Sequence, residues 1–220
     1  RLLLEENYSK SIQESINNDN WKKSIFFLSV ILVVGLIIRL YYVPYGLPIT
    51  LDGFGGYFMY ALDISILRDF PNYSPSQSGW GEFLSLFFMN FHSDNFIDYM
   101  DLQRTISVIL SAITVIPVYF ICKKFFNNYY SLIGAIIFAF EPRIIINSTL
   151  GISEPLYILA ISLGILFFLN SNKKIIYSSF GFFAWATIIR PEGQFWFIAF
   201  SIIYFLRFRK KRKDLIMFLA

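Results

Sequence analysis

The sequence predicts an all-α integral membrane protein, a multi-pass helical bundle with a long first extracytoplasmic loop that carries interfacial helices. Of the 220 residues, 56% are hydrophobic and 20% are aromatic. Only 15% are charged, against roughly 25% in an average soluble domain, which indicates lipid as the surrounding solvent. Ser24 to Tyr42 is apolar apart from Arg39, close to the roughly 20 residues needed to cross a bilayer.

The chain divides into a polar segment, residues 1–23, and a membrane domain, residues 24–220. We expect the first segment to be cytoplasmic and to form at most a short surface helix. Arg39, near the far end of the first apolar run, is expected to extend its charged head to the interface.

The apolar runs after the first loop predict the number of spans. They are shorter than the first and lie at Thr105–Ile121, Tyr129–Ile146, Pro155–Leu169, Ile175–Ile189 and Gln194–Phe208. Another run begins at Leu215. We therefore expect six spans plus the start of a seventh, in an N-terminal fragment of a longer membrane protein.

Residues 43–104 form the long first loop, in which Phe, Tyr and Trp are mixed among seven acids. The stretches Tyr57–Phe70 and Gly81–Phe91 suit helices that lie in the membrane interface. The turn-rich stretch Pro71–Gly79 joins them. A loop of this length can cover a site at the membrane surface.

The charge distribution predicts the orientation. With the N-terminus in the cytoplasm, every lysine and the basic run 207–213 lie inside, as the positive-inside rule requires. Ten of the fifteen acids then lie outside. The basic run is adjacent to the membrane, so it indicates a topological anchor on the anionic leaflet, and no nucleic-acid partner is expected.

Several kinds of chemistry are not supported by the sequence. Cys122 is the only cysteine and His92 the only histidine, so neither a disulfide framework nor a zinc site of these residues is expected. No Walker or dinucleotide-binding glycine motif occurs, so a reaction of ATP or of a nucleotide sugar is not supported.

Three short polar motifs reach the same outer surface in this topology. The first contains Asp52, beside glycines that allow a substrate to approach. The second runs from Glu141 to Pro155 and contains Arg143 and Glu154, and the third is Arg190-Pro-Glu192-Gly193. A carboxylate at a membrane surface is a candidate for function, and arginine binds phosphate through a planar fork of donors.

Each motif also has a local interpretation. Asp52 can be a turn residue, because Asp-Gly is a common turn pair. Arg143 and Arg190 can pair with Glu141 and Glu192, the acids two residues away. Glu154 can stabilise a helix N-terminus after a serine cap.

The chain resembles the GT-C glycosyltransferases. The resemblance rests on a first helix followed by a long outer loop with an early aspartate and two interfacial helices. It also rests on short later helices, on Ser153-Glu-Pro-Leu156 at the start of one of them, and on Ile189-Arg-Pro-Glu-Gly193. It covers about residues 20–210, and architecture carries more of it than residue identity does.

The resemblance implies a sugar donor linked to polyprenyl phosphate or diphosphate, a protein or lipid acceptor, and an active site on the extracytoplasmic face of the cell membrane. It matches Asp52 to the acidic residue of the family's first loop, and we expect Asp52 to act as the catalytic base that takes the acceptor's proton. The chemistry then needs cationic groups for the departing phosphate, and Arg143 and Arg190 are the candidates, supported by Glu154 and Glu192. Protein O-mannosyltransferases carry Asp-Glu where this chain has Asp52-Gly53, and the paired acids of metal-dependent members are incomplete. A divalent cation therefore stays an open question.

Two other classes of function stay open. A transporter would also place acids and arginines in a membrane cavity, but it more often has charged or broken positions near the middle of its helices and an internal repeat. Here the charges gather at the ends of the predicted helices. A non-catalytic membrane subunit is the other alternative.

Overall fold

The computed structural model describes residues 2–71 and 77–208, and the side chains of residues 21–71 and 77–207. All regular structure in these residues is helical, so the predicted all-α class is confirmed for them. The elements are α1 (Leu2–Tyr41), α2 (Leu51–Gly53), the π-helical turn η1 (Phe54–Phe58), α3 (Met59–Leu67), α4 (Gly79–Phe88), α5 (Phe96–Ile113), α6 (Val115–Lys123), α7 (Asn128–Phe140), α8 (Pro142–Thr149), α9 (Glu154–Phe168), α10 (Lys173–Ile189) and α11 (Gly193–Phe208).

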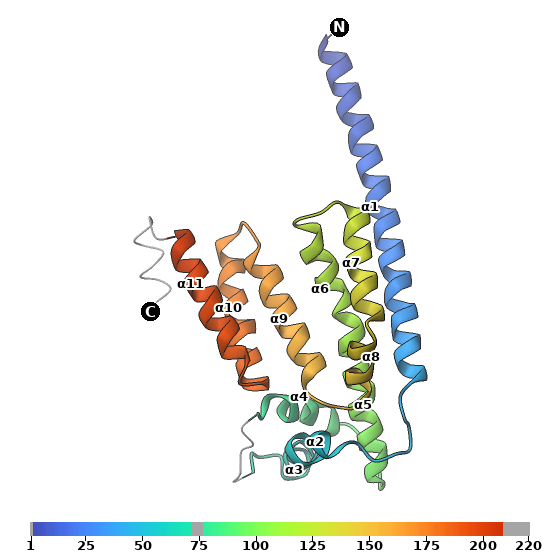
Figure 1. The fold of residues 1–220 in the computed structure, drawn as a ribbon, viewed down its shortest axis with the longest axis vertical. Coiled ribbons are helices and arrows are strands. Elements are labelled where there is room, and N and C mark those ends of the chain that lie inside the picture. Colours follow the sequence, from blue (N-terminus) through green and yellow to red (C-terminus); the bar gives the residue numbers. More distant parts are fainter. Residues whose placement is uncertain (1, 72–76, 209–220) are drawn as a thin grey trace.

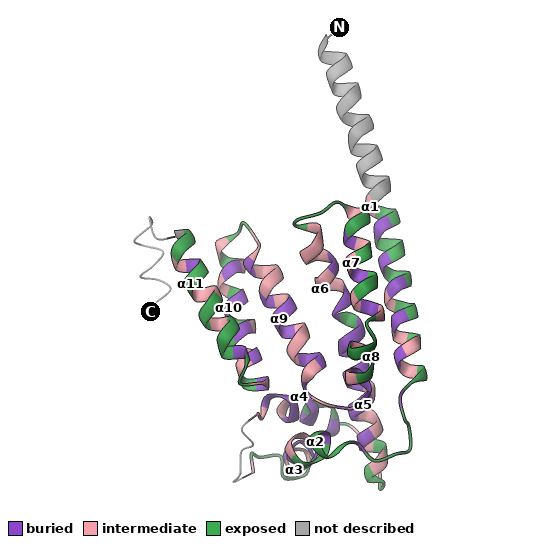
Figure 2. Cartoon of the chain, viewed as in Figure 1, coloured by how far each residue is buried: buried purple, intermediate pink, exposed green. Residues whose placement is uncertain are grey.

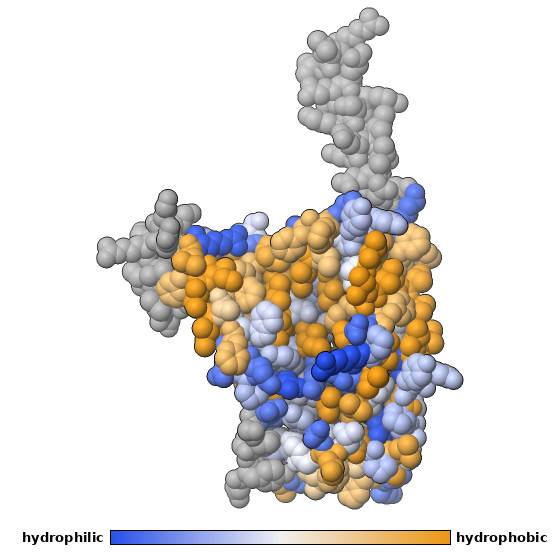
Figure 3. Space-filling model, viewed as in Figure 1, coloured by the Kyte–Doolittle hydropathy of each residue, from blue (hydrophilic) through white to orange (hydrophobic). Residues whose placement is uncertain are grey.

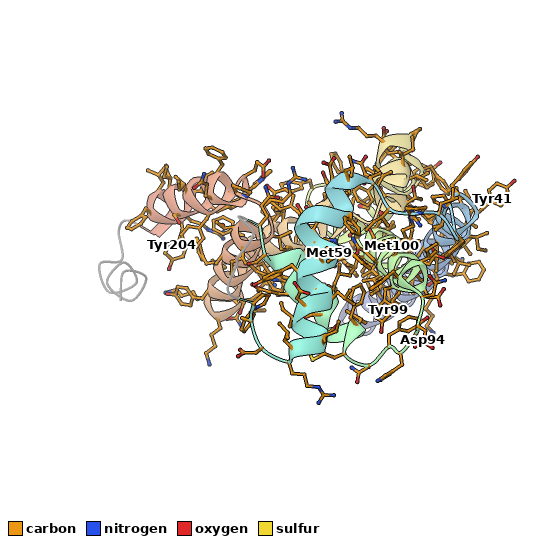
Figure 4. All side chains as sticks on the ribbon, turned by 90° about the horizontal axis from the view of Figure 1, so that it is seen from below. Tyr41, Met59, Asp94, Tyr99, Met100 and Tyr204 are labelled. Atoms are coloured by element: carbon orange, nitrogen blue, oxygen red, sulfur yellow. The ribbon has the colours of Figure 1, made fainter. Side chains whose placement is uncertain are left out.

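The long helices lie side by side, and three short ones cross one end of them. Figure 1 shows α1, α5 with α6, α7, α9, α10 and α11 running in nearly the same direction, with α2, α3 and α4 below them. Figure 4, a view onto that lower end, shows the helix of Met59 crossing the bundle between Tyr41 at one side and Tyr204 at the other. The two helices predicted within the first loop are thus present, as α2–η1–α3 and α4.

Two helices among the described residues are long and apolar enough to cross a membrane. They are Trp21–Tyr41, of 21 residues, and Phe96–Lys123, of 28 residues, which joins α5 to α6. The pair α7 and α8 is a third if its 47° bend lies within one span. α9 and α11 are apolar but shorter. Six spans therefore remain a proposal, and the predicted start of a seventh at Leu215 lies outside the described residues.

Local sequence explains where several helices begin. The side chains of Asn95, Asn127 and Asn172 accept hydrogen bonds from backbone N–H groups of the first turns of α5, α7 and α10. The run expected as one helix over Tyr129–Ile146 bends because Pro142 cannot donate a backbone hydrogen bond and keeps Glu141 extended.

The first helix is longer than expected. Residues 1–23 were predicted to hold at most a short surface helix, but α1 is continuous from Leu2 to Tyr41. The first span is therefore the second half of a 40-residue helix.

Arg39 does not extend to the interface, so that expectation is wrong. Its side chain is fully buried and donates hydrogen bonds to the Gly35 and Ala139 carbonyls at 2.9 Å and to Ser111 Oγ at 3.1 Å. Gly35 makes room for it, because a Cβ there would lie 3.1 Å from Arg39 Nη1. Because Gly35, one turn earlier in α1, has no side chain, Arg39 can turn inward, and its hydrogen bonds there join α1 to α5 and α7.

The short helices at the lower end pack closely through glycines. A Cβ on Gly81 would lie 3.0 Å from the Tyr60 ring, and one on Gly79 would lie 2.9 Å from the backbone nitrogen of Ile189. Between these glycines, Trp80 is completely buried. Figure 2 shows buried residues along α4 as well as along the long helices above it. α4 is therefore held against both α3 and the C-terminal end of α10.

The lysines whose side chains are described gather at the opposite end. Lys123 Nζ lies 3.6 Å from the centroid of the Trp21 ring, next to Lys22 and Lys23 on α1. A groove lined by Lys124 also touches Asn170 and Ile175, so the first turn of α10, with Lys173 and Lys174, lies at this end too. On the face shown in Figure 3, apolar side chains form a broad band over the long helices, and hydrophilic ones gather between that band and α2–α4.

Candidate functional site

Arg104, near the middle of α5, holds the chain just before Asp52. Its guanidinium is almost fully buried and donates to the backbone carbonyls of Leu47 and Pro48, at 2.6 and 2.7 Å. The Asp101 carboxylate, 3.0 Å from Arg104 Nη1, balances its charge. Asp101 also accepts a hydrogen bond from the backbone N–H of Gly46. The loop that leads to Asp52 is therefore attached to α5 at three points.

Gln103 fixes the residue after Asp52. Its Nε2 donates to the carbonyl of Gly53 at 3.3 Å and to that of Gly151 at 2.5 Å. Trp80 Nε1 donates to the same Gly151 carbonyl at 3.0 Å. Gly151 has a φ of +72°, a conformation that favours glycine. Gln103 and Trp80 therefore tie the Asp52 segment to the loop between α8 and α9.

Tyr57 makes a second connection between the same two segments. Its hydroxyl donates to Gln77 Oε1 at 2.8 Å and lies 3.2 Å from Ser153 Oγ. Ser153 makes no side-chain cap on α9, so the cap that the sequence suggested before Glu154 is not formed. The Ser153 hydroxyl instead faces the first loop.

Arg190 lies between two carboxylates. Its Nη1 forms a short ion pair with Glu154 Oε1, and its Nη2 lies 3.3 Å from Glu192 Oε1. The Arg190 and Glu154 side chains are 24% and 28% exposed, whereas Glu192 is 53% exposed. The guanidinium also lies 5.8 Å from the centroid of the Tyr157 ring. The local pairing of Arg190 with Glu192 is therefore present, but the closer partner is Glu154.

This cluster shifts the pKa values of its members. Burial lowers the pKa of Arg190, but hydrogen bonds and attraction from Glu192 and Glu154 outweigh burial and raise that pKa above its ordinary value. The hydrogen bond from Arg190 lowers the pKa of the Glu192 carboxyl. Arg190 therefore stays charged, and Glu192 stays ionised to a lower pH than an isolated glutamate.

Asp52 lies in the first turn of α2 with an exposed side chain. It makes no hydrogen bond or ion pair with any residue that the structure describes. Its neighbour Gly53 is buried, and a Cβ there would lie 3.3 Å from the Leu150 carbonyl. The Asp52 backbone is thus fixed beside the loop that precedes Glu154, while its carboxylate faces open space.

Arg143 is not part of the Arg190 cluster. It lies in the first turn of α8, is exposed, and has no ion pair or hydrogen bond among the described residues; the suggested local pair with Glu141 is not formed. One turn further along α8, Asn147 lines a very small cavity together with Glu154. Arg143 therefore lies on a helix that approaches Glu154, one turn away from the point of approach.

The described residues contain no group of three His, Cys, Asp or Glu side chains able to hold a metal ion.

A cavity of about 500 Å³ lies between α3, α4 and α10, with Arg68, Asp69, Glu82 and Trp185 in its wall. None of the five predicted site residues lines that cavity.

Sequence reasoning found the acids and arginines but missed the residues that position them. Gln103, Arg104 and Trp80 lie within apolar or mixed runs, where nothing in the spacing marks them. The only available signal was a polar pair, Gln103-Arg104, next to the start of a predicted span.

The structure thus brings the Asp52 segment to the loop before Glu154, and it joins Glu154 to Arg190.

Compared with protein-family models, curated proteins and solved structures, the chain gives no match in any of the three.

Proposed function

We propose that the protein is a membrane glycosyltransferase that moves a sugar from a polyprenyl-phosphate-linked donor to a protein or lipid acceptor at the extracytoplasmic face. The observation that carries the proposal is the joining of the three polar motifs at one end of the bundle. Gln103 and Tyr57 attach the Asp52 segment to Gly151 and Ser153, and Glu154 attaches that loop to Arg190.

The reaction needs a base and an anion-binding group at this end. Asp52 takes the proton of the acceptor as the acceptor atom forms its bond to the anomeric carbon of the sugar. The bond from that carbon to the phosphate oxygen breaks, and its electron pair leaves with the phosphate. Arg190 stabilises the charge that develops there.

The phosphate reaches Arg190 by replacing one of its carboxylate partners. Glu192 is the more exposed partner and lies at 3.3 Å, whereas Glu154 is closer and more buried. Glu192 is therefore the partner released, and Glu154 keeps the guanidinium oriented. Arg143, which is exposed and unpaired among the described residues, provides a second cation for the phosphate from α8.

Membrane placement supports a lipid donor. Two or three described helices are long and apolar enough to span a bilayer. Asp52 lies in the short helix α2 that follows the end of α1, and Arg190 directly follows the end of α10. The prenyl chain of the donor can therefore remain in lipid while its phosphate reaches Arg190. We also propose six spans, and the gathering of the described lysines at one end supports placing that end in the cytoplasm.

Transfer of radiolabelled sugar from a native lipid extract, in membranes of cells that express the protein, tests the proposal. Arg190→Lys keeps the charge but loses the planar fork, so the donor concentration needed for half-maximal rate should rise roughly tenfold. Arg68 lies at the same end of the molecule but is not part of this cluster. Arg68→Lys should therefore leave the donor concentration needed for half-maximal rate unchanged. If the rate depended on donor concentration in the same way in the wild type and in Arg190→Ala, Arg190 would be only a structural partner of Glu154 and Glu192.

A transporter is the second candidate function, and Arg39 is the observation that favours it. Its buried guanidinium lies within a candidate span, and its Nη2 has no hydrogen-bond partner among the described residues. Charged groups at such positions commonly mark substrate paths. The test is uptake of a labelled solute into proteoliposomes. Uptake by the wild-type protein that is abolished in Arg39→Met, together with no measurable sugar transfer, would favour a transporter over a glycosyltransferase.

A further inference from the structure

A groove at the lysine end of the molecule has the composition of a phospholipid site. It has a volume of about 550 Å³ and lies between α6, α9 and α10. Its described walls are formed by Phe120, Lys123, Lys124, Leu166, Phe167, Asn170, Ile175 and Ser178. We propose that this groove binds the headgroup and upper acyl chains of an anionic phospholipid.

The distribution of residue types in the groove fits both parts of such a lipid. Phe120, Leu166 and Phe167 belong to the apolar bodies of α6 and α9, so they suit acyl chains. Lys123 and Lys124 lie at the C-terminal end of α6, and Asn170 follows the end of α9. The two lysines and Asn170 are therefore at helix ends, where a phosphate at the membrane surface would meet them, and Ser178, in the second turn of α10, is the other polar residue of the wall.

The charge of the groove selects an anionic ligand. None of the described residues that line it is acidic, whereas two are lysines. Lys22, Lys23, Lys173 and Lys174 lie at the same end of the molecule but do not line the groove. Basic residues close to the surface of an anionic leaflet attract its lipids, by about 1 kcal/mol each.

Trp21 orders the lysine side of the groove. Its ring lies 3.6 Å below Lys123 Nζ, and its centroid is 6.2 Å from that of Phe120. The cation–π contact limits the positions available to the ammonium group before the lipid arrives. The groove lies at the opposite end of the bundle from Arg190, so its ligand is distinct from the proposed sugar donor.

Native mass spectrometry of the purified 220-residue chain in a nonionic detergent tests this inference. Phosphatidylglycerol should bind to the wild-type chain, and phosphatidylcholine with the same acyl chains should bind much more weakly. Lys123→Gln with Lys124→Gln should weaken phosphatidylglycerol binding about 30-fold, the effect of two such charges. Lys173→Gln with Lys174→Gln removes the same charge at the same end but outside the groove, and should change binding less than threefold.

Two further measurements separate the groove from general attraction between charges. Leu166→Trp fills the apolar wall without changing charge, and it should weaken binding of phosphatidylglycerol at least tenfold. Glycerol 3-phosphate, which has the headgroup phosphate but no acyl chain, should not compete at equal concentration. The proposal would be overturned if the two lysine pairs caused equal losses of binding or if the two lipids bound equally. It would also be overturned if Leu166→Trp bound phosphatidylglycerol fully or if glycerol 3-phosphate competed. None of these outcomes depends on sugar transfer.

Discussion

The hydroxyl of Tyr57 lies 3.2 Å from the hydroxyl of Ser153, which is 96 residues later in the chain. This contact joins the helical segment α2–η1, which begins at Leu51, to the residue before Glu154. It depends on η1, because the wider π-helical turn over Phe54–Phe58 changes the angular position of Tyr57 relative to Asp52. A π-helical turn within an α-helix often marks a functional site.

Tyr57→Phe should therefore slow sugar transfer while leaving the fold almost unchanged. The variant loses hydrogen bonds to Gln77 and Ser153, worth about 1 kcal/mol each in stability. We expect a roughly tenfold lower rate, because the Asp52 segment is then less well positioned.

Tyr99→Phe provides the matched control. The Tyr99 hydroxyl donates at 3.0 Å to the Phe91 carbonyl and contacts neither Gln77 nor Ser153, so its loss should cost about 1 kcal/mol, roughly half as much stability, and leave the rate unchanged. Ser153→Ala combined with Tyr57→Phe should cost less than the sum of the two single changes, because both remove one contact. Fully additive effects on rate would show that the contact does not position Asp52.

Gln103→Met should be destabilising despite its similar volume. The amide of Gln103 is completely buried, and its loss leaves the carbonyls of Gly53 and Gly151 with fewer donors. We expect a loss of about 1–3 kcal/mol in thermal unfolding of the detergent-solubilised protein. Trp80→Phe removes the donor to Gly151, which should cost about 1 kcal/mol, and it also leaves a cavity where the buried indole was, which adds to the loss of stability.

Gln103→Met should also reduce sugar transfer more than Trp80→Phe does, because only Gln103 holds the residue next to Asp52. Saturating donor should not restore the rate, since positioning of the base affects the chemical step. Complete rescue at high donor concentration would instead assign Gln103 to donor binding.

The pH dependence of stability should report the Arg190–Glu192 pair. The pKa of Glu192 is lower in the folded protein, because Arg190 donates a hydrogen bond to its carboxylate. The stabilisation is therefore complete above the unfolded pKa of glutamate, about 4.3, and is lost as pH falls through the lower folded value.

The difference in melting temperature between wild type and Glu192→Gln should thus be constant from pH 8 to about pH 6 and shrink below about pH 4. Glu82→Gln is the comparison at the same end of the molecule. If the difference for Glu192→Gln grows as the pH falls, the sign of the linkage is wrong and Arg190 does not stabilise the ionised form.

The orientation can be tested with single cysteines in a Cys122→Ser background. A cysteine at Asp94, an exposed position at the α3 end, should react with an impermeant thiol reagent in intact cells. One at Lys174, an exposed position at the lysine end, should react only after the membrane is opened. The reverse labelling would place Asp52 and Arg190 in the cytoplasm and contradict the proposed lipid-donor reaction.

The helical elements could be predicted from the sequence because apolar runs and turn residues act locally. The boundaries of α9, α10 and α11 lie within two residues of the predicted Pro155–Leu169, Ile175–Ile189 and Gln194–Phe208. The bend before Pro142 was not predicted, although its cause, the missing N–H of proline, is also local.

The contacts within the site could not be predicted in the same way. The closest partner of Arg190 is Glu154, on another helix, whereas the sequence offered Glu192, two residues away. Arg39 turned inward because Gly35 and Ser111 make a polar space for it, and that space exists only once α5 is packed on α1. Charge and spacing identified the candidate residues, and tertiary packing decided which of them meet.

The proposed function depends most directly on Asp52. Its carboxylate is exposed and has no hydrogen bond or ion pair among the described residues, so Asp52→Asn removes basicity without breaking a contact. Because its backbone is held through Gly53 by Gln103, the asparagine should occupy the same place. We expect the melting temperature to be unchanged and the rate of sugar transfer to fall by about 10²–10⁴-fold, the usual contribution of a general base.

Asp94→Asn is the matched control, since Asp94 is another exposed acid at the same end of the molecule. It should transfer sugar at the wild-type rate. Binding of the donor lipid, measured separately by retention in native mass spectrometry, should be the same in wild type, Asp52→Asn and Asp94→Asn. Loss of transfer with retained donor binding would place the Asp52 carboxylate in the chemical step. An Asp52→Asn protein that transfers sugar at the wild-type rate would reduce Asp52 to a turn residue, and the catalytic assignment would then be wrong.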